Sequence, residues 1–169
     1  MNFSETDIFP QTPLQVLVIG YGNPMRTDDG AGPAVASLLA HSLRSSPNCR
    51  CDTAHQLVPE HAEELLYAPR VLFIDASVDV PPGQIRISRL LPSEPSPHNL
   101  THHLAPQTLL WMTSMLFGRV PQAWSVAIGA ADLSVGNQLS AAVAKTCDRL
   151  SSHLAFHLQR WSTHSAHVH

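Results

Sequence analysis

The sequence predicts an α/β fold: a three-layer sandwich with a five-stranded, mostly parallel twisted sheet and helices on both of its faces. Short apolar runs rich in β-branched residues alternate along the chain with segments whose apolar residues recur at helical spacing. Helices that bury both faces of a parallel sheet explain why such strands are continuously apolar. We expect one domain over the 169 residues, with a core at about 14–161 and flexible termini at 1–12 and 162–169.

The first half of the chain predicts two strand–helix units and a third strand. The first strand is a β-branched run closed by Gly20, and the helix after it has Pro33 near its start, where a helix tolerates proline. The second helix also begins with proline and glutamate. In chain order the segments are 14–19 (strand), 30 to about 41 (helix), 51–58 (strand), 59–66 (helix) and 71–74 (strand).

The second half predicts two more strands and two more helices. Residues 84–90 alternate polar and apolar side chains, as in a half-exposed edge strand. Residues 92–103 contain three prolines and no periodicity, which indicates a loop. The remaining segments are 106–117 (an apolar helix), 124–128 (the fifth strand) and 139 to about 161 (a long amphipathic helix).

Charge and composition exclude several classes of function. With 10 Lys and Arg against 13 Asp and Glu, a net charge of -3 offers no basic surface for nucleic acid. We find no signal peptide and no apolar run of membrane-spanning length, so we expect a cytoplasmic protein without a membrane partner. The three cysteines lack CxxC spacing and are interpreted as ordinary thiols, with a metal site at Cys49-x-Cys51 as the alternative.

Ligands of such sheets bind beyond the carboxyl ends of the strands. Three segments meet that condition: the glycine-rich loop 20–32, Asp75 after the third strand, and the loop that ends at His102 and His103. A dinucleotide site is not supported in the first loop, because a third glycine is missing and two acids at the helix start would repel a pyrophosphate.

The two adjacent acids of this loop allow a structural and a functional interpretation. Thr27 or Asp28 can cap the helix, which leaves Asp29 free to point elsewhere. Asp75 can either hydrogen-bond a neighbouring loop or take part in chemistry. If the first and third strands are neighbours, Asp29 and Asp75 face one crevice, and a loop histidine would complete a set of ligands that suits a divalent transition metal. The sequence lacks HExxH, GxSxG and CxxC motifs.

Four segments together resemble the hydrogenase maturation proteases, the endopeptidases that remove a C-terminal extension from the large subunit of [NiFe] hydrogenases after nickel insertion. The similarity covers roughly residues 14–150 and keeps the order of the motifs. The segments are Gly20-x-Gly22-Asn23-Pro24-x-x-x-Asp28-Asp29-Gly30-x-Gly32, His55-Gln56-Leu57-x-Pro59-Glu60, Phe73-Ile74-Asp75-Ala76 and Thr101-His102-His103-Leu104.

This resemblance implies a metal site at Asp29, Asp75 and His102, with His103 as the alternative ligand and His98 as a weaker candidate. It implies an endopeptidase without a Ser or Cys nucleophile, whose nickel is supplied by its partner, the large-subunit precursor. The metal would polarise the carbonyl or supply hydroxide, and a carboxylate that does not ligate it could act as general base. We expect a monomer. The alternatives are a non-catalytic nickel-binding chaperone and a small-molecule α/β enzyme.

Overall fold

The computed structural model describes residues 14–95 and 104–164, and its centre is one five-stranded sheet. The strand order is β2-β1-β3-β5-β4; the first four of these strands run parallel to one another, and β4 runs antiparallel to β5. The prediction of a five-stranded, mostly parallel sheet is therefore confirmed. The strands are β1 (Val16–Tyr21), β2 (Cys49–Ala54), β3 (Arg70–Ser77), β4 (Ile85–Leu90) and β5 (Gln122–Gly129).

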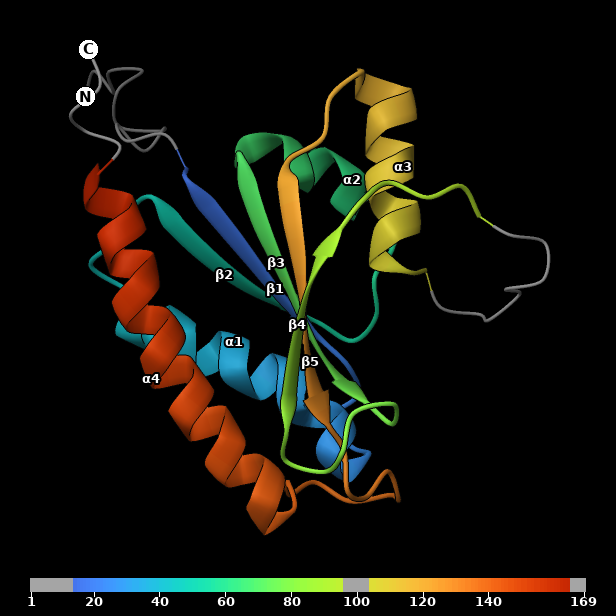
Figure 1. The fold of residues 1–169 in the computed structure, drawn as a ribbon, viewed down its shortest axis with the longest axis vertical. Coiled ribbons are helices and arrows are strands. Elements are labelled where there is room, and N and C mark those ends of the chain that lie inside the picture. Colours follow the sequence, from blue (N-terminus) through green and yellow to red (C-terminus); the bar gives the residue numbers. More distant parts are fainter. Residues whose placement is uncertain (1–13, 96–103, 165–169) are drawn as a thin grey trace, which may run out of the picture.

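Helices cover both faces of this sheet (Figure 1). Helices α1 (Ala31–Ser42) and α4 (Ala141–His164) lie on one face, and α2 (His61–Glu64) and α3 (Pro106–Phe117) lie on the other. Two short 3-10 turns, η2 (Thr27–Gly30) and η3 (Leu65–Tyr67), precede α1 and follow α2. No helix in the described part of the chain is long and apolar enough to cross a membrane.

Alternation along the central strands divides the core into two clusters. Val18 of β1 and Ile74 of β3 pack on the side of α1 and α4. Ile19 of β1 and Phe73 of β3 pack with α2 and α3 on the other side. Because both faces are buried, the central positions of these strands, 16–19 and 71–74, are all apolar, as the sequence predicted.

Several predicted boundaries were wrong, for identifiable reasons. Strand β2 ends at Ala54 instead of 58, because its pairing with β1 ends at Tyr21, just before the positive-φ residue Gly22. The predicted helix 59–66 is four residues of α2 followed by η3, and Ala68 after it is extended, as expected for a residue that precedes a proline. The predicted flexible termini lie almost entirely outside the described residues.

Candidate active site

The loop between β1 and α1 folds tightly against the ends of β1 and β3 because glycine occupies its points of closest approach. Gly22 has a φ of 140°, and a Cβ there would lie 2.0 Å from the carbonyl oxygen of Asp29. A Cβ on Gly32 would lie 2.3 Å from the carbonyl oxygen of Ile74 on β3. The loop therefore brings Asp29 back over the end of β1, where the amide of Asn23 donates a 3.0 Å hydrogen bond to Asp29 Oδ2.

Asp75 lies near the end of β3, on the face of the sheet that packs against α2 and α3. It follows Phe73 by two residues, and Tyr21 follows Ile19 by two residues on the neighbouring strand, so all four side chains share that face. The Tyr21 hydroxyl donates a 3.0 Å hydrogen bond to Asp75 Oδ2. Both side chains are half-buried.

Burial raises the pKa of Asp75 to about 6, because a charged carboxylate loses solvation there. The nearby charge of Asp29 raises this pKa further, whereas the Tyr21 hydrogen bond and the charge of Arg86 lower it. Arg86 belongs to the same row as Asp75 across the sheet, since both pair with Ala127 of β5. The two acids are therefore close enough for the charge of one to act on the other.

Asp29 and Asp75 meet at the topological switch point of the sheet. From β1 the chain passes through α1 to β2 on one side, and β3 lies on the other side of β1. Open α/β sheets bind their ligands at such a point, beyond the carboxyl ends of the strands. Strands β1 and β3 are neighbours, which is the condition under which the sequence placed these two acids together.

The expectation that Thr27 or Asp28 caps the helix was wrong. Neither η2 nor α1 has a side-chain cap, and Asp28 instead contacts the segment between β5 and α4. Its carboxylate accepts hydrogen bonds from the amides of Ala131, Asp132 and Ser140 and from the Ser140 hydroxyl, at 2.7–2.9 Å. The Thr27 hydroxyl also contacts this segment, at 2.9 Å from the carbonyl oxygens of Asp132 and Ser134.

The histidine candidates His98, His102 and His103 lie outside the described residues. The first described residue after them is Leu104, which packs against the same apolar cluster as Tyr21. Within residues 14–95 and 104–164, no group of three or more His, Cys, Asp or Glu side chains is arranged to hold a metal ion. Asp29 and Asp75 are the two predicted ligands that the structure describes.

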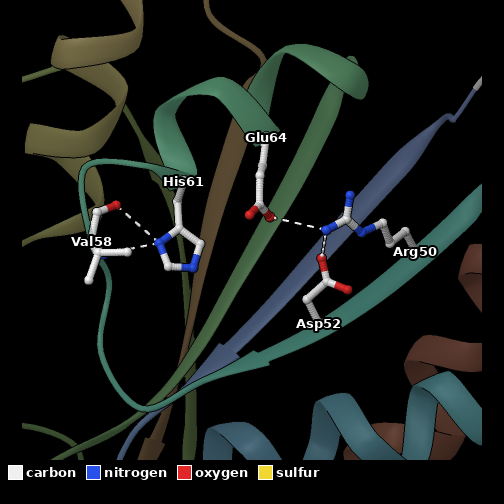
Figure 2. A network of polar contacts seen from close by, with 5 residues as sticks. All are labelled: Arg50, Asp52, Val58, His61 and Glu64. Carbon is white, nitrogen blue, oxygen red and sulfur yellow. Dashed lines mark hydrogen bonds and ion pairs between the residues drawn. The ribbon is translucent and has the colours of Figure 1, made fainter.

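A second polar cluster lies beside β2, at the edge of the sheet (Figure 2). One guanidinium nitrogen of Arg50 is 2.6 Å from Asp52 and 3.2 Å from Glu64 of α2. His61 Nδ1 is turned back to the backbone of Val58 in its own turn. Partly exposed ion pairs of this kind stabilise a fold weakly, and they are consistent with a charged edge strand that discourages pairing with other chains.

The cysteines are free thiols, in agreement with the interpretation from sequence. Burial raises the pKa of Cys49, Cys51 and Cys147, which disfavours the thiolate that a metal or a nucleophilic reaction requires. Cys49 and Cys51 pack against the cluster on the α1 and α4 side of the sheet.

Sequence reasoning missed Tyr21 and Arg86. The available signal for Tyr21 was alternation, because it lies two residues beyond buried Ile19 and so faces the same side. Arg86 carried no signal of this kind, because its place beside Asp75 depends on the antiparallel register of β4 against β5.

Several solved structures with this architecture are hydrogenase maturation proteases. The [NiFe] hydrogenase maturation protease HycI from Thermococcus kodakarensis KOD1 is similar over 88% of this chain and 94% of its own, with 20% identity and a TM-score of 0.69. The chain has the fold of these proteases. The maturating endopeptidase HybD from E. coli gives 18% identity and a TM-score of 0.66 over 87% of this chain and 93% of its own.

A third protease with this fold is the hydrogenase 2 maturation peptidase from Thaumarchaeota archaeon SCGC_AB-539-E09. It is 22% identical, with a TM-score of 0.58 over 85% of this chain and 97% of its own. No protein-family model and no curated protein matches the sequence. The similarity to the maturation proteases is therefore a similarity of fold across nearly their whole length.

Proposed function

We propose that this protein is an endopeptidase that removes the C-terminal extension of a [NiFe] hydrogenase large-subunit precursor after nickel insertion. One observation carries the proposal: two half-buried carboxylates, Asp29 and Asp75, share the switch point of a sheet whose fold is that of hydrogenase maturation proteases. The motif segments quoted above support the same reaction.

In this proposal nickel belongs to the substrate, and the two aspartates recognise it. Each has one oxygen engaged, Asp29 by the amide of Asn23 and Asp75 by the hydroxyl of Tyr21. Within the described residues, the second oxygen of each accepts no hydrogen bond. A divalent cation between two carboxylates would also relieve the repulsion that raises the pKa of Asp75. The donor set therefore fits such an ion.

His102 is the proposed third contact to the nickel. The described chain resumes at Leu104, two residues after His102, and Leu104 packs against the cluster that contains Tyr21, on the face of the sheet that carries Asp75. Consecutive residues of an extended segment project to opposite sides, so only one of His102 and His103 can face the acids.

Cleavage in this scheme needs no Ser or Cys nucleophile. Water attacks the scissile carbonyl, which the precursor's nickel polarises, and a carboxylate oxygen of Asp29 or Asp75 that is not bonded to the nickel accepts the proton of that water. The proton then passes to the leaving amine. A precursor without nickel offers the acids no ion to recognise, so its extension remains attached.

The test is incubation of the protein with a [NiFe] hydrogenase large-subunit precursor purified with and without nickel. We expect loss of the extension only from the nickel-loaded precursor, measured by intact-protein mass spectrometry. Cleavage of both forms would contradict nickel recognition. No cleavage, together with tight stoichiometric nickel binding by the protein alone, would replace the proposal with a metal carrier.

The histidine assignment has its own pair of variants. His102→Ala should abolish nickel-dependent cleavage, whereas His103→Ala should retain most of it, since only one imidazole can face the two acids. Both are measured in the assay above. The reverse result would move the third contact to His103 and leave the roles of Asp29 and Asp75 unchanged.

A further inference from the structure

Tyr21 is the tyrosine whose hydroxyl donates a hydrogen bond to Asp75 at the proposed site. It is the last residue of β1 and fills the position between the two glycines of the Gly20-x-Gly22 segment, which the motif leaves open. Its side chain packs against the apolar cluster on the α2 and α3 side, and its hydroxyl reaches Asp75 Oδ2 at 3.0 Å. An apolar residue could fill the same space, but it could not donate this hydrogen bond.

We propose that Tyr21 is a positioning residue, which fixes the Asp75 carboxylate so that its second oxygen faces the crevice shared with Asp29. This inference rests on the proposed function, in which that crevice receives the precursor's nickel. Tyr21 would not contact substrate itself, and it would act through the orientation of Asp75.

The charges around Asp75 explain why its carboxylate needs a fixed partner. Asp29 repels it from one side, and Arg86 attracts it toward β4. These two charges act on the carboxylate but do not hold it against rotation about its side chain. The Tyr21 hydroxyl opposes this rotation because its ring is held by packing, and its single hydrogen bond takes one oxygen and leaves the other.

The Tyr21 phenol is protonated at neutral pH and can donate. Burial raises the pKa of Tyr21 above its ordinary value, and the charge of Asp75 and the hydrogen bond to it act in the same direction. The geometry of the hydrogen bond, between side chains on adjacent strands, carries the inference independently of this shift.

The test compares Tyr21→Phe with Tyr67→Phe. The first removes only the hydroxyl at the site, and the second removes a hydroxyl from an exposed tyrosine before β3, at the opposite end of that strand from Asp75. In single-turnover cleavage of nickel-loaded precursor, we expect Tyr21→Phe to lower the maximal rate at least tenfold with an unchanged half-saturating precursor concentration. Tyr67→Phe should behave as the wild type, and both variants should keep the melting temperature.

A second measurement does not depend on cleavage. The carboxyl carbon of Asp75, followed by NMR in the free protein, should titrate at higher pH in Tyr21→Phe, because the lost hydrogen bond stabilises the charged form. If Tyr21 acted through packing alone, the pH at which Asp75 titrates would be the same in Tyr21→Phe as in the wild type. Failure of Tyr21→Phe to fold would overturn the inference, because it would assign the hydroxyl a structural role.

The outcomes separate this inference from the proposed function. Wild-type protein that does not cleave loaded precursor contradicts the proposed function, and the titration then decides whether Tyr21 holds the carboxylate. An unchanged titration or an unchanged maximal rate in Tyr21→Phe, in protein that cleaves normally, overturns the role of Tyr21 alone. A weaker half-saturation with a normal rate also overturns it, because that result indicates a substrate contact.

Discussion

Asp28 and Asp75 lie in neighbouring segments at the same end of the sheet, but they differ in burial, in hydrogen bonding and in the direction in which the pKa is shifted. Asp28 is completely buried and accepts four hydrogen bonds, whereas Asp75 is half-buried and accepts one within the described residues. Burial would raise the pKa of Asp28, but the donors from Ser140, Ala131 and Asp132 outweigh it and lower that pKa. The pKa of Asp75 rises to about 6. Burial alone therefore does not distinguish a structural acid from an acid available for chemistry.

The two acids should affect stability with opposite dependence on pH. The lowered pKa of Asp28 means that its contribution to folding is present above the pKa of an unfolded aspartate and is lost as pH falls through its folded pKa. The raised pKa of Asp75 means that the folded state becomes less stable as pH rises from 3.8 to about 6. Asp28 stabilises the fold in its charged form, and the charged form of Asp75 opposes folding.

The largest expected effect is on activity in Asp75→Asn. The amide keeps the size of the side chain but removes the charge that a nickel ion requires, so we expect cleavage to fall by about a thousandfold, or about 4 kcal/mol. The same variant should be more stable than the wild type at pH 7, because a charged group is no longer held in a poorly solvated place. Cleavage and urea denaturation on one preparation measure both effects.

Asp79→Asn is the matched control, because Asp79 is an exposed acid four residues after Asp75. It should change neither property. Full activity in Asp75→Asn would remove Asp75 from the reaction, and a loss of stability at pH 7 would assign it a structural role like that of Asp28.

The next effect is on stability in Asp28→Asn. The amide nitrogen would face backbone donors that need an acceptor, so we expect a loss of about 2–4 kcal/mol in the free energy of unfolding at pH 7. The measurement is urea denaturation. A loss below about 0.5 kcal/mol, as expected for an ordinary surface substitution, would contradict the structural role of Asp28.

The contrast between these acids marks the limit of what the sequence could predict. Strands β1 and β3 could be predicted from the sequence, because both of their faces are buried and their central residues are therefore apolar. These two strands are neighbours, and this brings Asp29 and Asp75 close to each other. The true partners of Asp28 lie 103 to 112 residues away along the chain, in a segment without recognisable periodicity. Local propensity therefore predicted that Asp28 caps the helix, whereas its carboxylate instead accepts hydrogen bonds from residues far along the chain.

The antiparallel direction of β4 could not be predicted from the sequence either, because it also depends on long-range pairing. Alternation correctly indicated an edge strand over 84–90, but alternation is identical for both strand directions. The direction places Arg86 in the row of Asp75, so part of the electrostatics of the site could be seen only in the fold. The third predicted contact, His102, stays a prediction.

A smaller effect is expected from Ser140→Ala. This change removes the hydroxyl that donates to Asp28 Oδ2 at 2.9 Å but keeps the Ser140 amide that donates to Oδ1 at 2.7 Å. We expect a loss of about 1 kcal/mol from urea denaturation. The Asp28→Asn, Ser140→Ala double variant should lose less than the sum of the two losses, and strict additivity would show that the two groups do not interact.

A further effect is a change of slope with pH. Between pH 4 and 6 the wild type should lose stability through Asp75, and Asp75→Asn should lack that contribution, with a difference that grows to about 1–3 kcal/mol after allowance for solvent. Melting temperatures of both proteins at several pH values in this range measure it. Parallel curves would contradict the raised pKa of Asp75.

The most direct test of the contrast is an NMR titration of the aspartate carboxyl carbons in the wild-type protein, assigned with Asp28→Asn and Asp75→Asn. We predict that Asp75 titrates near pH 6 and that Asp28 titrates below the ordinary pKa of an aspartate, 3.8, in the same sample. Titration of both carboxyls at the ordinary value, or in the reverse order, would contradict the assignment of one acid to the fold and the other to the site.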